Sequence, residues 1–264
     1  MNPSPVAVSD GLHKLTPEYG DAVAKSLYTS YKDLAPTLAW ENKETLDIGC
    51  HWGYLQKMLI ETAGVKSAYG VDIHPRWEDV GKHNPNGTGK IRLLCGNVTK
   101  IEELQSMQFD LILSSGTMMT MPIPILEAVT TWIFDHLNPG GSALVNIRSF
   151  LSYWGGDFQS QFKENIHYAH LLFGKPAIEE ALGEEVRYMV PYCAATWAMH
   201  FFRHGFEIVN MIRGSNPFPE IRDLHCQRLR HYEEEELATA QVKLWLRKPE
   251  VDSDVKKFLN GKTA

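Results

Sequence analysis

Short runs of apolar residues alternate with longer stretches of helical periodicity along most of this chain. Five runs predict β-strands, at residues 45–48, 67–73, 91–94, 109–113 and 142–147. The run at 109–113 is apolar at nearly every position, which is typical of a strand that is covered on both faces. A sixth strand is predicted to start at residues 205–209, and a seventh to cover residues 241–246.

Helices are predicted between these strands, at residues 53–63, 122–137 and 191–204. Near the N-terminus, Thr16 is a capping residue and Pro17 suits a first helical turn, so a helix should run toward Trp40 with a break at Pro36. Strands that alternate with helices indicate βαβ units and an α/β fold with a doubly wound parallel sheet. In such a sheet the ligand binds at the carboxyl ends of the strands, near the point where the strand order reverses.

The alternation stops after Phe150, and residues 151–189 are rich in Tyr, Trp, His and Gly. We interpret the chain as one domain in four parts. These are an N-terminal helical cap at 1–42, an α/β core at 43–149, a helical insertion at 150–190 and the rest of the core at 191–264. The polar stretch at 213–236 is interpreted as a solvated loop or helix end without chemistry.

Composition narrows the class of protein. The 264 residues carry 26 Lys+Arg against 32 Asp+Glu, a net charge of −6 without a basic block, which argues against nucleic-acid and anionic-membrane partners. No stretch approaches the ~18 apolar residues needed to span a bilayer. The four cysteines, Cys50, Cys95, Cys193 and Cys226, are too scattered for a zinc ribbon or a disulfide framework. Because the N-terminus also lacks a secretory pattern, a cytoplasmic protein is expected.

The most informative segment follows the first predicted strand. Asp47 closes that strand, Gly49 and Gly53 make a turn, and a helix comes next. Glycines let the backbone approach a ligand closely, and the N–H groups at a helix start attract polar ligand atoms. Asp72, nineteen positions after Gly53, closes the next strand, where a carboxylate suits a bidentate grip on ribose hydroxyls.

Two cofactor classes use such a turn. A dinucleotide site of the form G-x-G-x-x-G would need glycines where His51 and Tyr54 stand. The spacing instead resembles the D-x-G-x-G-x-G of class I S-adenosylmethionine-dependent methyltransferases, with His51 in place of the middle glycine. Residues 109–115, and the L-x-P-G-G pattern at 137–141, also resemble that family; the resemblance covers about residues 40–150 and is weaker at 200–247.

The resemblance implies S-adenosylmethionine as cofactor, and a cofactor site along the first four strands. The residues implied are Asp47, Gly49, His51, Gly53, Asp72, Ile73, Gly96, Asn97, Val98 and Ser114. In this family the acid at Asp72 holds the ribose, and Asn97 with its apolar neighbour Val98 contacts adenine. His tolerates φ > 0 better than most residues do, and its ring would either pack over the cofactor's amino-acid moiety or turn to solvent.

The family has no shared catalytic residue, because methyl transfer needs mainly alignment, water exclusion and often a base. His167 and His170 are three apart and would share a helical face, which makes them candidates for a general base. They could equally be ordinary surface or core histidines, or bind a metal, although no metal site is expected. The candidate substrate-binding residues are Met118, Tyr153, Trp154 and Tyr192, and for Met118 core packing is an equally open interpretation.

The expected activity is therefore methylation of a small molecule, on oxygen first, nitrogen next, with sulfur as a further candidate. Residues 114–117 lack the N-P-P-Y signature of enzymes that methylate amino groups of nucleic acids and proteins. Alternatives are a fold that binds the cofactor but catalyses another reaction, a binding module, or a nicotinamide-dependent reductase. We expect a monomer or homodimer without nucleic-acid or membrane partners.

Overall fold

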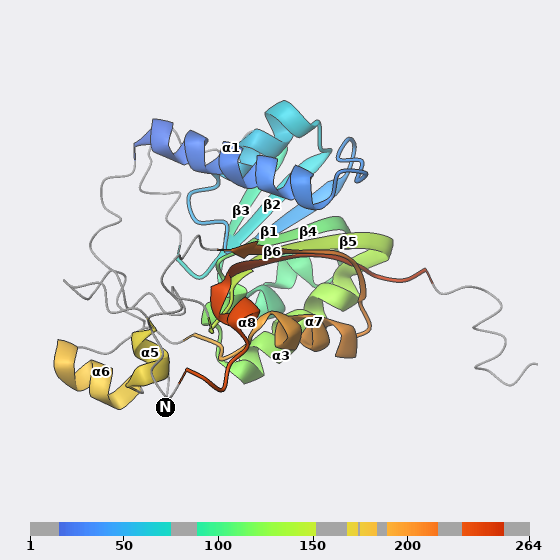
Figure 1. Ribbon diagram of the computed structural model, residues 1–264. Coiled ribbons are helices and arrows are strands. Elements are labelled where there is room, and N and C mark those ends of the chain that lie inside the picture. The colour runs from blue at the N-terminus through green and yellow to red at the C-terminus, as the bar shows by residue number, and fades with distance from the viewer. Residues whose placement is uncertain are drawn as a thin grey trace, which may run out of the picture.

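The computed structural model describes residues 16–74, 89–151, 168–173, 175–183, 189–215 and 229–250. Within them seven strands form one sheet in the order β3-β2-β1-β4-β5-β7-β6 (Figure 1). The strands are β1 (Glu44–Ile48), β2 (Ser67–Asp72), β3 (Ile91–Cys95), β4 (Phe109–Ser115), β5 (Leu137–Arg148), β6 (Glu207–Ser215) and β7 (Thr239–Arg247). The strand order reverses between β1 and β4, which confirms the predicted doubly wound, seven-stranded α/β sheet.

The sheet is mixed. Strands β1 to β5 pair in parallel, whereas β7 lies antiparallel to both β5 and β6. The parallel sheet predicted from the βαβ units thus comprises β1 to β5, and β7 with β6 extends it in antiparallel pairing. Strands β6 and β7 are consecutive in sequence and neighbours in the sheet, the arrangement in which antiparallel pairing forms most readily.

Helices cover both faces of the sheet (Figure 1). Helix α1 (Pro17–Leu34) and α2 (Tyr54–Met58) lie on one face, and α3 (Ile123–His136) and α7 (Ala194–Arg203) on the other. Successive residues of the central strands point to opposite faces. In β4, for example, Leu111 and Leu113 pack toward α1 and α2, while Ile112 belongs to the core beneath α3 and α7. This double burial explains why the central strands are apolar at nearly every position.

The helix boundaries follow their capping residues closely. The Thr16 hydroxyl accepts a hydrogen bond from the Tyr19 amide at 3.3 Å, and α1 ends at Leu34, ahead of the predicted break at Pro36. The helix predicted from Gly53 starts at Tyr54 and changes to a π-helix, η2 (Leu59–Ala63), before Gly64 ends it with φ 68°. Sequence periodicity does not distinguish this wider helix from an α-helix.

The remaining described elements are short. They are η4 (Val98–Lys100), η5 (Glu102–Leu104), η6 (Met118–Thr120), α5 (Ala169–Leu172), α6 (Lys175–Leu182) and α8 (Glu234–Ala238). Strand β5 starts five residues before the predicted Ser142, because its first part pairs with Phe109 across an irregularity in the register.

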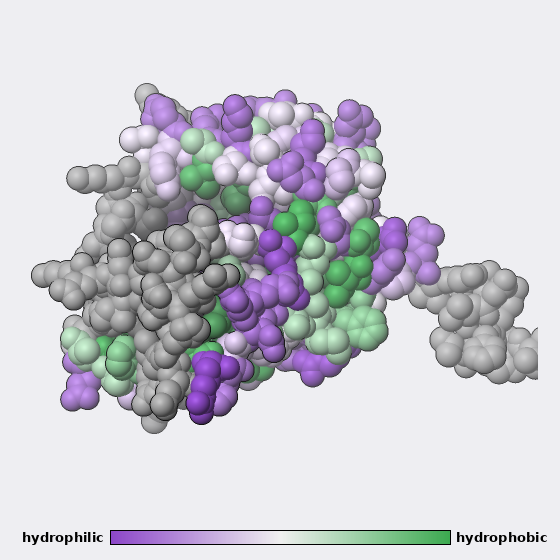
Figure 2. All heavy atoms as spheres, viewed as in Figure 1, coloured by the Kyte–Doolittle hydropathy of each residue, from purple (hydrophilic) through white to green (hydrophobic). Residues whose placement is uncertain are grey.

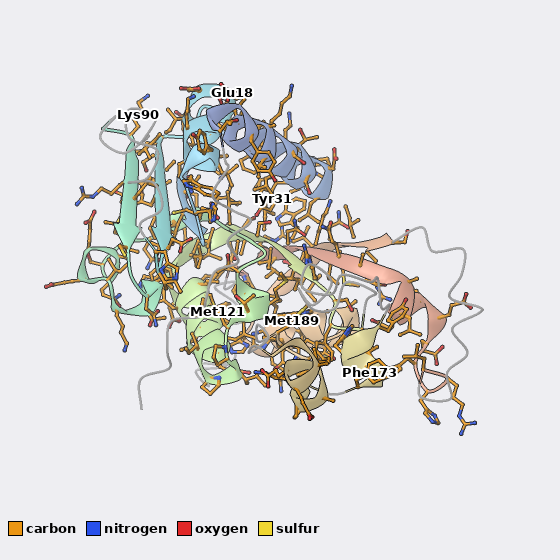
Figure 3. All side chains as sticks on the ribbon, turned by 90° about the vertical axis from the view of Figure 1, so that its left-hand side faces the viewer. Glu18, Tyr31, Lys90, Met121, Phe173 and Met189 are labelled. Carbon is orange, nitrogen blue, oxygen red and sulfur yellow. The ribbon has the colours of Figure 1, made fainter. Side chains whose placement is uncertain are left out.

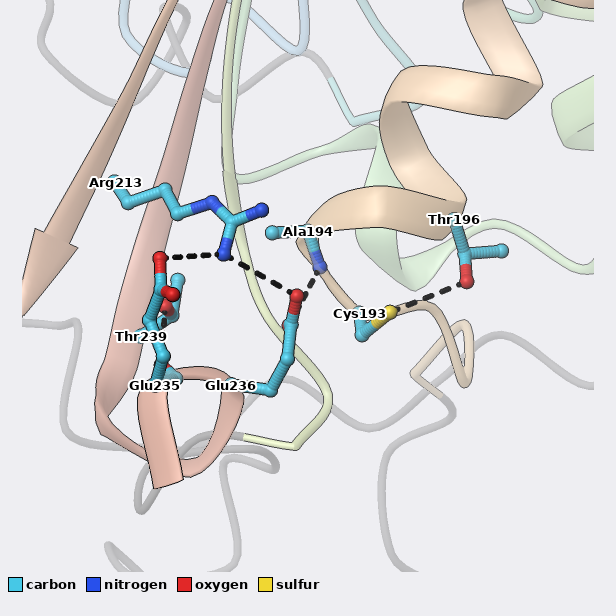
Figure 4. A network of polar contacts seen from close by, with 7 residues as sticks. All are labelled: Cys193, Ala194, Thr196, Arg213, Glu235, Glu236 and Thr239. Atoms are coloured by element: carbon cyan, nitrogen blue, oxygen red, sulfur yellow. Dashed lines mark hydrogen bonds and ion pairs between the residues drawn. The ribbon is translucent and has the colours of Figure 1, made fainter. Parts of the chain in front are cut away.

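The polar stretch before β7 contains α8, which ties β6 to the start of α7 (Figure 4). Arg213 of β6 makes ion pairs with Glu235 at 2.8 Å and with Glu236 at 3.4 Å. The other Glu236 carboxylate oxygen accepts a hydrogen bond from the Ala194 amide at 3.2 Å. Because Cys193 provides no side-chain cap, this carboxylate satisfies a first-turn N–H of α7 from another element.

On the face in Figure 2, the surface over α1 at the top of the view is mainly hydrophilic.

Within the described ranges, no helix combines the length and the apolar character that crossing a membrane requires.

The L-x-P-G-G pattern has a steric explanation at Gly141. A Cβ atom there would lie 2.8 Å from the Asn138 carbonyl oxygen and 3.3 Å from the Asp110 carbonyl oxygen, both of which are backbone atoms. Backbone atoms cannot rotate away as a side chain can, so this position requires glycine. Gly140 precedes it with φ 75°, a conformation that glycine adopts without strain.

We expect Gly141→Ala to lower the free energy of unfolding by about 1–3 kcal/mol, the usual cost of overpacking. Urea denaturation followed by circular dichroism measures this change. Gly214→Ala is the matched control, because Gly214 also lies in a strand and its added Cβ would make an ordinary 3.4 Å contact with the Gln241 Cβ. Equal losses in the two variants would contradict the steric explanation.

Candidate functional site

The turn after β1 lies at the carboxyl edge of the sheet, beside the point where the strand order reverses. The amides of Gly49 and Cys50 both donate to the Val71 carbonyl of β2, at 2.7 and 3.1 Å. Gly49 and Gly53 have φ of 87° and 79°, so both adopt the left-handed conformation that glycine allows without strain. This requirement explains why the motif has glycine at these two positions. The turn is thus built from β2 as well as from β1.

His51 stands at the middle glycine position and also has a positive φ, 54°. Its ring lies edge-on to Trp52, with ring centroids 3.4 Å apart. Its amide donates to the Asp72 carboxylate at 3.0 Å. A histidine in this conformation is strained relative to glycine, and the charge-assisted hydrogen bond offsets part of that strain.

Asp72, the last residue of β2, accepts one backbone hydrogen bond on each carboxylate oxygen, from His51 and from His74, both at 3.0 Å. Each oxygen keeps a second lone pair for a ligand hydroxyl. Next to Asp72, the Ile73 side chain is 68% exposed, which is high for a large apolar residue. The end of β2 therefore presents two hydrogen-bond acceptors of the Asp72 carboxylate next to the exposed apolar side chain of Ile73.

The end of β3 reaches the same edge, since the Gly96 amide donates to the Asp72 carbonyl at 2.8 Å. Asn97 caps η4, its side-chain oxygen accepting from the Thr99 amide at 3.0 Å. Val98 is buried in the core. The structure therefore brings Gly49, His51, Asp72 and Gly96 together, while the Val98 side chain points away from the edge into the core.

Asp47 is a buried acid. Its carboxylate accepts a hydrogen bond from the Gln56 amide at 3.0 Å, and its side chain is 5% exposed. Burial, with a smaller contribution from the Asp72 charge, raises the pKa of Asp47 to about 7 despite the Gln56 hydrogen bond. Among the described residues, no ion pair reaches Asp47 in this structure.

Tyr31 of α1 reaches the same place from above the sheet (Figure 3). It is almost fully buried, and burial together with the Asp47 charge raises its pKa well above the ordinary value. Its phenol therefore stays neutral and presents a hydroxyl dipole near the Asp47 carboxylate. Helix α1 thus closes the top of the turn.

The segment after β4 covers the turn from the other side. The Ser114 hydroxyl donates to the Ile48 carbonyl at 3.1 Å, so it joins the ends of β4 and β1. A Cβ atom at Gly49 would collide with the Thr117 side chain, which shows that Thr117 lies directly against the glycine. Met118 is fully buried in the core, as one of the two interpretations of this methionine expects.

The residues expected on the substrate side are only partly described. Tyr153, Trp154 and His167 lie outside the described residues. Tyr192 packs edge-on against Trp197, with ring centroids 5.1 Å apart, and its carbonyl accepts from the Phe150 amide at 3.0 Å. The predicted substrate-side residue Tyr192 therefore lies next to the end of β5.

His170 of α5 also reaches the end of β5. Its Nε2 lies 2.6 Å from the Phe150 carbonyl oxygen, and because a carbonyl can only accept, Nε2 carries a proton. Burial lowers the pKa of His170 to about 4, so the ring is neutral near pH 7.

The sequence analysis did not place three side chains at this edge. They are Gln56, Thr117 and Tyr31, the last of which lies near Asp47. Gln56 follows Asp47 by nine residues on the helix after the turn, and its burial at 0% exposure is unusual for an amide. Thr117 and Tyr31 come from elements distant in sequence. Only the fold brings them to the turn, so no local pattern could have identified them.

Comparisons with known proteins agree with this geometry. Residues 45–141 match a family model described as a methyltransferase domain. A comparison with curated proteins finds no match to this chain.

Among solved structures, an S-adenosylmethionine dependent methyltransferase from Mesorhizobium loti superimposes with a TM-score of 0.57 at 15% identity, over 86% of this chain and 99% of that one. A candidate S-adenosylmethionine dependent methyltransferase from Listeria monocytogenes gives a TM-score of 0.58 at 16% identity, over 86% of this chain and 99% of that one. The N-methyltransferase NodS from Bradyrhizobium japonicum, solved in complex with S-adenosylhomocysteine, gives 0.52 at 12% identity, over 92% and 94%. At these identities the structures show a shared fold.

The family model covers β1 to the start of β5, which includes the whole glycine turn, Asp72 and the segment after β4. The fold outside that range agrees with the same class. Residues 45–141 thus match a methyltransferase domain, and the chain shares the Rossmann-like fold of solved class I S-adenosylmethionine-dependent methyltransferases.

Proposed function

We propose that this chain transfers a methyl group from S-adenosylmethionine to a small molecule, with a hydroxyl oxygen as the first acceptor, an amine next and sulfur as a further candidate. The observation that carries the proposal is the edge formed by the turn after β1, with Asp47 buried beside it and Asp72 at the next strand end.

The cofactor fits the electrostatics of Asp47. A buried carboxylate whose pKa is raised to about 7 lacks a positive partner. S-adenosylmethionine carries an ammonium group and a sulfonium, and a cation close to Asp47 would stabilise its ionised form. The neutral Gln56 amide would hold that carboxylate in place, and the neutral Tyr31 phenol nearby would not compete for the charge.

The nucleoside end of the cofactor fits the end of β2. Two ribose hydroxyls can each donate to an Asp72 oxygen that already accepts one backbone N–H. The exposed Ile73 side chain offers an apolar surface for a base, and the Asn97 side-chain amide retains donors while its oxygen caps η4. Gly49, His51, Gly53 and Gly96 would shape this edge through their backbone and Ser114 through its hydroxyl bond to Ile48, whereas the Val98 side chain lies in the core.

The acceptor would bind on the side covered by the segments after β4 and β5. Met121 and Met189, labelled in Figure 3, are both partly buried there. The Val190 amide donates to the Met119 carbonyl at 2.7 Å, which joins the two segments. Thioethers adapt to varied apolar and aromatic surfaces, so this wall suits a small aromatic substrate, together with Met118, Tyr153, Trp154 and Tyr192 of the sequence prediction.

When bound, the cofactor supplies an electrophilic methyl group on a sulfonium. The chain's own part is to align the two reactants, exclude water and remove a proton from the acceptor. His170 remains a candidate for that last role, with His167 beside it in sequence. With Nε2 donating to Phe150, any proton it took from substrate would have to go to Nδ1.

A second candidate function is a protein that binds the cofactor but catalyses another reaction or serves as a binding module. Burial lowers the pKa of His170 to about 4, which makes its ring a weak base and favours this alternative. Assays that detect S-adenosylhomocysteine production separate the two, since only methyl transfer releases it.

We further propose a cytoplasmic monomer or homodimer without nucleic-acid or membrane partners. The net charge of −6 and the hydrophilic surface over α1 support this proposal.

We expect Asp72→Ala to weaken S-adenosylhomocysteine binding by about 1.5–3 kcal/mol, or roughly 10- to 150-fold, because hydrogen bonds to a charged group are lost. Calorimetric titration of the ligand-free protein measures the dissociation constant. Asp135→Asn, a change at an exposed carboxylate on α3, is the matched control. An unchanged constant in Asp72→Ala would remove the ribose role, and binding of NAD in place of S-adenosylhomocysteine would overturn the cofactor assignment.

The raised pKa of Asp47 makes stability depend on pH in the ligand-free protein. Between about pH 4 and 7 the folded state holds a proton that the unfolded state has released, so the free energy of unfolding falls as pH rises. The loss is complete above about pH 7 and amounts to at most about 4 kcal/mol.

Asp47→Asn cannot ionise, so relative to this variant the parent should lose stability progressively from pH 4 to 7. Urea denaturation at several pH values measures the difference between the two proteins. A difference that stays constant over this range would show that Asp47 is not a buried acid of raised pKa.

We expect His170→Ala to lower turnover by about 10²-fold, the low end of a general base's usual contribution because its lowered pKa makes it a weak base, while the dissociation constant for S-adenosylhomocysteine stays within about twofold. Turnover is measured as S-adenosylhomocysteine released with a panel of phenolic acceptors, and thermal unfolding checks that the fold is intact. Equal turnover in variant and parent would remove His170 from catalysis. Turnover with amines and with no phenol would contradict oxygen as the first acceptor.

A further inference from the structure

Three metal-ligating side chains meet between α3 and α7, on the face of the sheet opposite α1. Glu127 comes from α3, and His200 and His204 come from successive turns of α7. The ligand atoms of all three residues lie within 4.8 Å of one another. Histidines four residues apart lie on one face of a helix, so both rings can reach one point.

The hydrogen bonds around His200 fix its tautomer. The Thr130 hydroxyl donates to the Leu126 carbonyl at 2.8 Å, so it has no proton left for His200. Because His200 Nε2 lies 2.8 Å from that same hydroxyl oxygen, Nε2 must carry the proton and donate it. The Nδ1 atom therefore holds a lone pair.

That lone pair has no hydrogen-bond partner. His200 is completely buried, and its Nδ1 makes no hydrogen bond in this structure. The nearest charged atom is Glu127 Oε1 at 3.5 Å, which is itself an acceptor. A buried acceptor without a donor costs about 1–3 kcal/mol, so this atom needs an explanation.

His204 shows the same arrangement on its other nitrogen. Its Nδ1 lies 2.8 Å from the His200 carbonyl oxygen and must donate to it. Its Nε2 faces Glu127 Oε2 at 2.8 Å. A proton held between these two atoms would satisfy His204 and Glu127, yet it would leave His200 Nδ1 unpaired.

We propose that Glu127, His200 and His204 bind a divalent transition-metal ion of the Zn²⁺ type, with Glu127 through its carboxylate, His200 through Nδ1 and His204 through Nε2. One ion between the three side chains satisfies every lone pair that faces the cluster. Each histidine then donates its other N–H to a neighbouring oxygen, the arrangement that orients metal-bound imidazoles in proteins. The proposal is independent of the methyl-transfer function.

The spacing of the ligand atoms suits this ion. With Zn–N and Zn–O distances of about 2.0–2.2 Å, neighbouring ligands of a tetrahedral site lie roughly 3.3 Å apart. The two distances run to different Glu127 oxygens, 3.5 Å from His200 Nδ1 to Oε1 and 2.8 Å from His204 Nε2 to Oε2, and they lie on either side of that value. Two imidazoles and one carboxylate favour zinc over magnesium, which prefers oxygen ligands.

The cluster is open on one side. The Glu127 side chain is 41% exposed and that of His204 13%, whereas His200 forms the buried base. An ion could therefore enter from solvent and keep a fourth position for water. Once bound, it would join α3 to α7, two helices that the chain connects only through β5 and the segment after it.

Zinc titration of the untagged, EDTA-treated full chain tests the proposal. Calorimetry measures how many equivalents of Zn²⁺ each protein binds, and how tightly. At Zn²⁺ concentrations that saturate the parent, the Glu127→Gln and His204→Gln variants should each bind one equivalent less than the parent, or bind that equivalent at least tenfold more weakly. His231→Gln, which removes an exposed histidine outside the cluster, is the matched control and should bind as the parent does. Equal stoichiometry and affinity in the parent and both cluster variants would overturn the site.

A second measurement does not depend on counting equivalents. At a hundredfold excess over its dissociation constant, Zn²⁺ should raise the unfolding midpoint of the parent by about 5–10 °C, and Mg²⁺ should not. Glu127→Gln replaces a partly exposed side chain by its isostere, so it should fold normally and lose this shift. An equal shift in parent and variant, or with Mg²⁺, would contradict a zinc-type ion held by these three residues.

Discussion

The carboxylate of Asp72 fixes the geometry on which the functional edge depends. It accepts the amide of His51 from the turn after β1 and the amide of His74 beyond β2, so it joins the ends of two neighbouring strands. Both bonds are charge-assisted, and together they hold a turn that contains three residues of positive φ. Without this anchor the strained His51 would have little reason to stay in the left-handed region, and the backbone cradle would open.

The same edge concentrates negative charge that the protein alone does not balance. Asp47 lies beneath the turn and Asp72 beside it, and burial together with the Asp72 charge raises the cost of ionising Asp47. A protein selected only for stability would place a neutral residue at position 47, because a buried acid without a cation destabilises the fold. An acid at this position is explained if a positively charged ligand completes the site. The ligand-free fold would then be less stable than with a neutral residue, while the acid would strengthen binding of the ligand, as is common at functional sites.

Much of this architecture could be predicted because the relevant signals are local. The apolar run at 109–113, covered on both faces, identified β4, and Thr16 identified the start of α1, whereas the predicted run of that helix toward Trp40 was wrong because it ends at Leu34. The position of Asp47, Gly49 and Asp72 at one edge of the sheet could be predicted because a glycine turn between two strand ends is encoded by adjacent residues. The orientation of β7 and the π-helix at Leu59–Ala63 depend instead on tertiary pairing and on helix register, which periodicity does not report. Tyr31, Gln56 and Thr117 reach the turn from three other elements, so only the folded sheet reveals them.

The cluster between α3 and α7 shows the same limit in another form. His200 and His204 are four residues apart on a predicted helix, and this spacing is visible in the sequence. Histidine pairs with the same spacing are, however, common on ordinary amphipathic helices. The third ligand, Glu127, precedes them by more than seventy residues and lies on the other side of β5 in the chain. What distinguishes this pair from ordinary histidines is the direction of its hydrogen bonds: Thr130 and the His200 carbonyl each occupy one ring nitrogen and turn the other toward Glu127. A metal site is thus recognised here by the proton positions that its surroundings impose, which follow from the fold and not from the spacing of the residues.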